Sequence, residues 1–441
     1  MVLISVWCAF EFLYAARSGY WKSQGIFPAI PVGVRLTFAE LIVGTFIILI
    51  GGYYLTRRVI VDRRVRVSPR GYKKLSLIYI FCILISALIG VLLRAPDIFT
   101  EARSFLIPGS LFFVFYNLPI SPYLEEWVCS WFYRVGVAAF VFGVLVAVFP
   151  SPFRGLVSLP GGITFAEGYW MAFYAGVFAW SIAIARLLWG GFSLKSISVV
   201  CIALAVAFLY LGNKPIVFTL FVSLGTLTIV ALLSADPAVR RRAWGTTLSV
   251  PSLIFVTLVL LPQSLLNQLV RVFAQRYLKI WGVSSVQDLQ DSFSQAGQGQ
   301  DLSAGRFEIW QSYFSQAVEG YGLAPDGFGG VPLVYMPLHG WIEAFPAHNT
   351  IAYIAYHGGL IAAALYAIII VRFVFEGFGR VRRIDLSNDY LSRPEIVGIF
   401  AFVVGIIAVG LVGGPLLDYR LSWFFWFLTA ALLKRWNRVS E

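Results

Sequence analysis

The sequence predicts an all-α, polytopic membrane protein with about twelve transmembrane helices and one long extracytoplasmic loop. The chain has 441 residues, of which 59% are hydrophobic and 13% are charged. Its mean hydropathy is +0.80. A soluble protein of this length would need far more polar surface, so the composition indicates an integral membrane protein.

The individual spans follow from the length of the apolar stretches. A helix that crosses a bilayer needs about 20 predominantly apolar residues. The first stretch carries no basic n-region and no A-x-A cleavage site, so we expect a retained helix rather than a signal peptide. The predicted spans lie roughly at residues 2–16, 36–55, 75–93, 104–118, 127–149, 166–189, 194–212, 215–233, 245–262, 348–371, 396–413 and 421–433.

The distribution of positive charge predicts the orientation of these helices. With twelve spans and a cytoplasmic N-terminus, about 21 of the 34 lysines and arginines lie on the cytoplasmic side. Basic residues favour that side of a membrane, so we expect both termini in the cytoplasm. The net charge of +12 then reflects topology, and we expect no nucleic-acid partner.

One connection is far longer than the others, and the charge distribution places it outside the cytoplasm. It covers residues 263–347, after the nine helices predicted in 1–262 and before the three predicted in 348–441. Its first part has the spacing of a helix in the membrane interface, and a polar part rich in Gln, Ser and Gly follows. The stretch RFEIWQSYFSQAVEG then resumes helical periodicity before a glycine-rich turn region. We expect interfacial and short helices in this loop and no second soluble domain.

The cysteines and the charges inside the spans offer little chemistry. Cys8, Cys82, Cys129 and Cys201 each fall in a predicted span without metal-site spacing, so we interpret them as small apolar packing residues. Arg134 is the clearest charge in the middle of a span. The sequence has no P-loop, HExxH or GxSxG motif and no acidic cluster for hard cations.

His348 is the first candidate for chemistry. It stands in PAHNTIAYIAYHGG, where Pro346 suits a helix start and places His348 near the first turn. The positive end of the helix dipole disfavours an imidazolium, so His348 should stay neutral near pH 7 and be able to accept a proton. The alternative is that it only caps the helix. His357 lies on the opposite face of a regular helix, and we interpret it as a packing or helix–helix contact residue.

Arg306 and Lys214 are the second and third candidates. Arg306 opens a predicted helix, where a cation is unfavourable unless an anion lies between it and the helix N-terminus. Lys214 lies in the tight connection LYLGNKPIVF, on the same predicted outer side as Arg306 and His348. The alternatives are an arginine at lipid headgroups and a snorkelling lysine. Together the three residues suggest a site for a lipid-linked anion.

Two stretches resemble the O-antigen ligase and O-antigen polymerase superfamily. AHNTIAYIAYHGGLIAAALYAIII is similar to the His-Asn signature that opens the span after the family's large periplasmic loop. GRFEIWQSYFSQAVEGYGLAPDGFGG is similar to the family's Arg-x-x-x-Trp helix, which ends in a glycine-containing turn. The family's leucine- and glutamate-rich continuation after His-Asn is replaced here by IAYIAYHGG. The specific part of the resemblance covers roughly residues 305–365.

The resemblance implies a C-type membrane glycosyltransferase that uses neither a nucleotide sugar nor a metal, and no cofactor. His348 corresponds to the family histidine and Arg306 to the loop arginine, while Lys214 stands where the family usually has a second arginine. Asn349 and Arg420 are accessory candidates. The implied partners are a polyprenyl-diphosphate-linked glycan donor, a glycan or lipid-linked acceptor and membrane lipids.

The expected reaction is an inverting transfer at the periplasmic face of the bacterial inner membrane. His348 would act on the acceptor hydroxyl, and Arg306 and Lys214 would bind the diphosphate. Polymerisation of repeat units and ligation to another acceptor both remain open. The alternative from another class is a transporter or flippase for lipid-linked or small solutes.

Overall fold

The computed structural model shows a helical protein. It describes residues 72–93, 112, 115–117, 122–148, 158–159, 163–164, 170–209, 214–246, 249, 267, 306–319, 333–336, 340–343, 349–381, 393–413 and 419–439. The helices are α4 (Lys73–Leu92), α6 (Pro122–Val148), α9 (Trp170–Gly190), α10 (Leu194–Leu209), α11 (Lys214–Leu232), α15 (Arg306–Glu319), α16 (Thr350–Val381), α17 (Arg393–Gly413) and α18 (Tyr419–Val439).

The predicted spans coincide with these helices wherever the structure describes them. Helices α4, α6, α9, α10, α11, α16, α17 and α18 each overlap one predicted span. Within the described residues, four helices are long and apolar enough to cross a membrane, at Lys74–Leu92, Tyr123–Leu145, Thr350–Val381 and Arg393–Val412. The predicted spans at 2–16 and 36–55 lie outside the described residues, as do most of 104–118 and most of 245–262. The all-helical membrane class is therefore supported, and the total of twelve spans stays a prediction.

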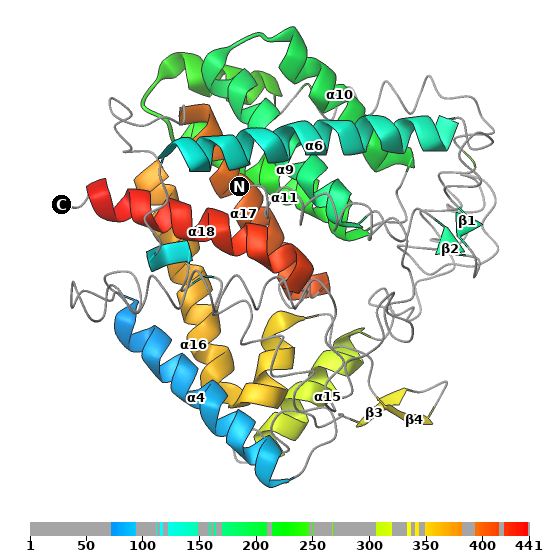
Figure 1. The fold of residues 1–441 in the computed structure, drawn as a ribbon, viewed down its shortest axis with the longest axis vertical. Helices are drawn as coiled ribbons and strands as arrows, with labels where there is room; N and C mark the ends of the chain where they lie inside the picture. Colours follow the sequence, from blue (N-terminus) through cyan, green and yellow to red (C-terminus); the bar gives the residue numbers. More distant parts are fainter. Residues whose placement is uncertain are drawn as a thin grey trace.

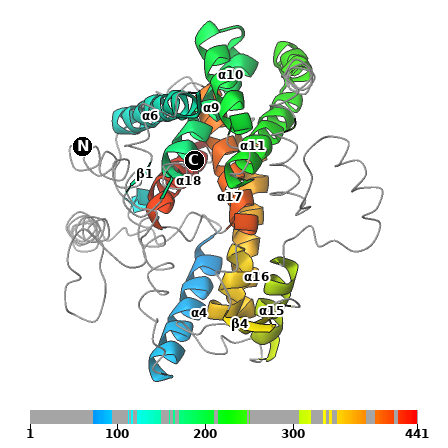
Figure 2. The same cartoon turned by 90° about the vertical axis from the view of Figure 1, so that its right-hand side faces the viewer.

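The helices form two groups joined by α16 and α17. Figures 1 and 2 show α6, α9, α10 and α11 in one group and α4, α15 and the first part of α16 in the other. Glycines allow close approach inside the first group. A Cβ at Gly136 of α6 would lie 2.0 Å from the carbonyl oxygen of Ala175 in α9, and one at Gly405 of α17 would lie 2.5 Å from the Ser223 hydroxyl of α11. Small residues of this kind are typical of membrane helix interfaces.

Helix α18 crosses α17 and completes the core between the groups (Figure 1). The Phe424 ring stacks on the ring of Phe132 in α6 at a centroid distance of 3.5 Å. Twelve residues later, the Trp436 ring lies 5.0 Å from the ring of Phe373 in α16. Trp436 is also held through its backbone, because the Arg380 guanidinium donates a hydrogen bond to its carbonyl oxygen.

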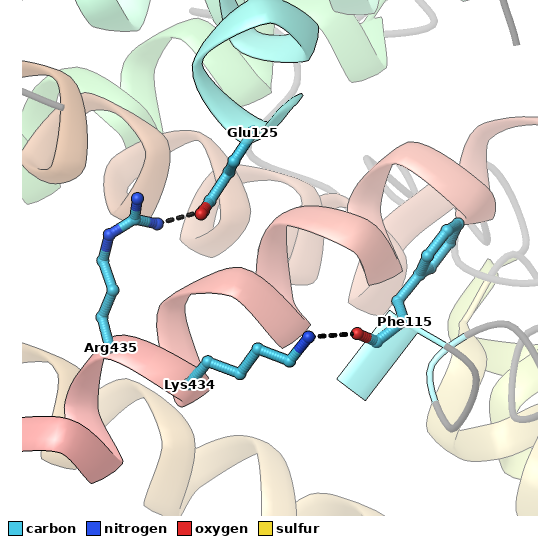
Figure 3. A network of polar contacts seen from close by, with 4 residues as sticks. All are labelled: Phe115, Glu125, Lys434 and Arg435. Atoms are coloured by element: carbon cyan, nitrogen blue, oxygen red, sulfur yellow. Dashed lines mark hydrogen bonds and ion pairs between the residues drawn. The ribbon is translucent and has the colours of Figure 1, made fainter. Parts of the chain in front are cut away.

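The C-terminal turns of α18 carry two cations that contact other segments (Figure 3). Arg435 forms an ion pair with Glu125 near the start of α6, and both side chains are largely buried, with 6% and 12% exposed. The Lys434 Nζ donates a hydrogen bond of 2.6 Å to the carbonyl oxygen of Phe115. These basic residues, which the sequence suggested only as topology signals, therefore also fix α18 against α6 and the segment around Phe115.

Helix α16 changes direction at Gly359, where φ is 87° and ψ is 161°. This backbone conformation is essentially restricted to glycine. The kink separates residues 349–358, which we call the α16 arm, from the long second part of the helix. At the end of the arm, the buried Ser86 of α4 donates its hydroxyl to the carbonyl oxygen of His357.

Two short antiparallel pairs of strands interrupt the otherwise helical structure. Strand β1 (Ser158–Leu159) pairs with β2 (Ile163–Thr164), and β3 (Leu333–Met336) pairs with β4 (Gly340–Glu343). Helix α15 confirms the helix expected in the long loop. The β3–β4 pair corrects the expectation of helices and turns alone, because the apolar strands LVYM and GWIE pair across a three-residue connection. His339 lies in that connection, which is outside the described residues. The interfacial helix expected in the first part of the long loop is also outside them.

One expectation about exposure is wrong. Cys129 is buried, and Cys82 is half-buried, but Cys201 lies on an exposed face of α10, so it is not a packing residue within the described structure. Arg134, the charge in the middle of a predicted span, is exposed on the surface of α6. In both cases the side that a neighbouring helix covers is the opposite one. Cys8 lies outside the described residues.

Candidate functional site

Asn349 caps the start of α16. Its side-chain Oδ1 accepts hydrogen bonds from the backbone amides of Ile351 at 2.9 Å and Ala352 at 3.1 Å. Its carbonyl oxygen accepts the next amide, that of Tyr353, at 3.0 Å. Asparagine is one of the preferred residues for this position. The accessory candidate Asn349 thus has a structural role that the sequence interpretation missed, although the preference for Asn at helix starts could have indicated it.

The start of α16 is attached to the end of α17. The buried Thr350 Oγ1 donates a hydrogen bond of 2.8 Å to the carbonyl oxygen of Gly410. Gly410 lies in the last turn of α17, where carbonyl groups have no partner within the helix. This hydrogen bond fixes the position of the helix start that follows His348 in the sequence. His348 itself lies outside the described residues.

The start of α11 lies beside the same end of α17 as the start of α16. The Ser223 hydroxyl of α11 donates a hydrogen bond of 3.2 Å to the Ala401 carbonyl of α17. One turn earlier in α11, Thr219 faces Gly405, which lies one turn later in α17. The two helices are therefore antiparallel. Continuing this register along α11 places its first residue, Lys214, beside the last turn of α17. That is the turn to which Thr350 is bonded.

The start of α15 packs on the α16 arm. Ile309 and Tyr313 of α15 form an apolar cluster with Ala352 and Tyr356 of the arm. The rings of Tyr313 and Tyr356 meet edge to face, with centroids 5.4 Å apart. The first two turns of α15, which begins at Arg306, therefore pack against the first two turns of α16.

Arg420 belongs to the first turn of α18. This helix begins at Tyr419, six residues after α17 ends at Gly413. Six residues span at most about 20 Å, so the start of α18 cannot lie farther than that from the end of α17.

The starts of α11 and α16 thus lie beside the end of α17, and α15 packs on the first turns of α16. The start of α18 lies within about 20 Å of that end. The structure describes the backbone of Lys214, Arg306 and Arg420, and the directions of their side chains stay predictions. The positive ends of several helix dipoles near one place favour an anion there, although at the start of α16 the amides of Ile351 and Ala352 are already bonded to the Asn349 side chain. Within the described residues, no group of three or more His, Cys, Asp and Glu side chains could hold a metal ion.

His357 is buried in the arm. Its ring lies 4.3 Å from the ring of Tyr353 and 4.8 Å from that of Tyr356, measured between centroids. Its backbone carbonyl oxygen is the acceptor for Ser86. The interpretation of His357 as a packing residue at a helix–helix contact is therefore confirmed.

Comparison with models of known protein families and with curated proteins gave no match to this chain. The resemblance to the O-antigen ligase and polymerase superfamily therefore depends on the two quoted stretches around Arg306 and His348 alone.

Proposed function

We propose that this chain is a membrane glycosyltransferase that moves a glycan from a polyprenyl-diphosphate carrier to an acceptor hydroxyl. The observation that supports the proposal best is the gathering of the starts of α11, α15 and α16 around the end of α17. Lys214 and Arg306 occupy the first positions of two of these helices, and Asn349 caps the third. Cations and helix N-termini in one region suit a diphosphate, which both attract.

The proposed chemistry is a single displacement at the anomeric carbon. The acceptor oxygen forms a bond to that carbon while the bond from the carbon to the phosphate oxygen breaks, and the electron pair leaves with the diphosphate. His348 receives the proton of the acceptor hydroxyl, a contribution that is typically about 10²–10⁴-fold in rate. Arg306 and Lys214 stabilise the charge that develops on the departing diphosphate. Attack opposite the leaving group inverts the anomeric centre.

The same chemistry serves two biological outcomes, which differ in the acceptor. A polymerase adds the growing chain to a further lipid-linked repeat unit, whereas a ligase adds a finished chain to a lipid or protein. Cells that lack a polymerase accumulate single repeats on the carrier, and cells that lack a ligase accumulate long chains on it. The lipid-linked glycans of a deletion strain therefore separate the two.

The direct test is glycosyl transfer by purified protein in lipid nanodiscs. The donor is the polyprenyl-linked glycan extracted from a strain lacking the gene, supplied with excess chelator. We expect transfer in the wild type, and a loss of about 10²-fold or more in Arg306→Ala and Lys214→Ala. Lys195→Ala is the matched control, because Lys195 also lies in the first turn of a helix, α10. That helix begins four residues after α9 ends, and Arg186 near the end of α9 pairs with Glu395 at the opposite end of α17.

The outcomes of this assay separate the candidate functions. Equal loss in Lys195→Ala and Lys214→Ala would contradict the assignment of the site. Movement of lipid-linked glycan across vesicles without any new glycosidic bond would indicate the flippase alternative instead.

A further inference from the structure

The α16 arm, residues 349–358, is held at both ends by buried hydroxyl groups. At its start, Thr350 donates to the carbonyl oxygen of Gly410 in α17. At its end, Ser86 of α4 donates to the carbonyl oxygen of His357. All four groups belong to buried residues, since Ser86, Thr350 and His357 are each 1% exposed and Gly410 is buried as well.

The second contact lies beside the kink of α16. In a regular helix, the carbonyl of His357 would accept the amide four residues later. The non-helical conformation of Gly359 falls between these two residues and interrupts that pattern. A buried carbonyl without a partner costs about 1–3 kcal/mol, and Ser86 supplies a donor from a different helix.

Helix α4 also packs closely against the residue before the kink. A Cβ at Gly358 would lie 3.0 Å from the Cδ1 of Ile83, one turn before Ser86 on α4. Helix α4 therefore both packs against the end of the arm and bonds to it. These contacts link the direction of the arm, and so the place of Asn349, to α4.

We infer that Ser86 is a positioning residue for the reaction proposed above: its hydroxyl fixes the kink of α16 and so aims the start of the arm at the region where α11 and α15 begin. This inference depends on the proposed function for its catalytic readout only. Ser86 acts through the His357 carbonyl, about 12 Å along the arm from Asn349, by the rise of about 1.5 Å per residue.

The test combines a distance measurement with kinetics. Spin labels at Gln311→Cys of α15 and Ile229→Cys of α11, both exposed positions, report on the arm relative to α11 in a background without the native cysteines. The label on α15 reports the position of the arm, because the first turns of α15 pack on the arm. Pulsed electron spin resonance in nanodiscs gives the distance distribution for the wild type and for Ser86→Ala.

Ser86→Ala should shift or broaden this distribution. It should also lower kcat by about 10-fold or more while the KM for the lipid-linked donor changes by less than about 3-fold, because misplaced groups affect the transition state more than donor binding. The matched control is Ser181→Ala. Ser181 is equally buried, but its hydroxyl bonds within its own helix to the carbonyl of Val177. This variant should match the wild type in both measurements.

Three results would overturn the inference. An unchanged distance distribution in Ser86→Ala would show that the hydroxyl does not fix the arm. Equal changes in Ser181→Ala would reduce the effect to a general loss of packing. A rise in donor KM with unchanged kcat would place Ser86 in binding instead of positioning. If the wild type shows no glycosyl transfer at all, the proposed function fails, and the distance distributions alone then decide whether Ser86 fixes the arm.

Discussion

The ion pair between Arg435 and Glu125 should stabilise the protein far more than an ordinary surface pair. Its side chains are 6% and 12% exposed, whereas those of the Arg372–Glu376 pair within α16 are 40% and 27% exposed. Removing one partner of a buried pair leaves an uncompensated charge and costs about 3–5 kcal/mol. An exposed pair four residues apart on a helix contributes about 0.3–0.5 kcal/mol.

The two pairs can be compared in the same protein. We expect Glu125→Ala and Arg435→Ala each to lower the free energy of unfolding by about 3 kcal/mol or more. The double variant should be far less harmful than the sum of the two, giving a coupling energy of about 2–4 kcal/mol. The corresponding cycle on Arg372 and Glu376 should give less than about 1 kcal/mol.

Unfolding is followed by denaturant titration of the detergent-purified protein, with far-ultraviolet circular dichroism as the signal. Glu125→Gln supplies a check, because it keeps the shape and a hydrogen-bond acceptor but removes the charge. Coupling energies that are equal for the buried and the exposed pair would refute the reasoning from burial.

Four further outcomes follow from the structure and the topology. Gly359→Ala should cost about 1–3 kcal/mol of stability in the same titration, because alanine disfavours the backbone conformation at the kink; an unchanged midpoint would argue against the kink. Asn349→Ala should cost about 1 kcal/mol through loss of the helix cap, whereas Asn349→Asp should retain most of the stability; equal losses would indicate that capping is not the reason. Lys214→Arg should keep transfer activity within about 3-fold of the wild type, since arginine preserves the charge and adds the bidentate geometry suited to phosphate; inactivity in a folded variant would count against a diphosphate contact. Reporter fusions after Gly299 and Asp236 should show an extracytoplasmic and a cytoplasmic position, respectively, and the reverse result would overturn the predicted orientation.

Hydropathy located the helices well but not their ends. The prediction ended the tenth span at residue 371, whereas α16 continues to Val381. The additional turns carry Arg372 and Glu376, whose ion pair supports helix beyond the apolar stretch. Likewise, α18 runs to Val439, past the predicted end at 433, because its basic residues contact α6 and the segment around Phe115.

Features that depend on contacts between distant segments could not be predicted from one sequence. The residues HGG indicate a weak point in a helix, but only the donor from Ser86 shows what holds the kink. The exposure of Arg134 and Cys201 depends on which helix face a neighbour covers, and hydropathy does not carry that information. The strands β3 and β4 are short, and their pairing depends on a connection of three residues.

The sequence could propose residues for the candidate site, but it could not indicate where in the fold the helix starts that carry them would lie. Lys214, Arg306 and Asn349 could be selected because each stands at a break between polar and apolar sequence. Their common location depends on the register of α11 against α17 and on one hydrogen bond from Thr350 to Gly410. Neither relation leaves a trace in a single sequence.

The position of α18 has a consequence for biosynthesis. Its rings fill the space between α6, α9, α16 and α17, with Phe424 against Phe132 and Phe178 and Trp436 against Phe373. Those helices leave the ribosome before α18 does, so their facing aromatic surfaces must wait in the membrane without their final neighbour. A chain that ends before residue 419 would therefore lack the rings that fill the space between these helices.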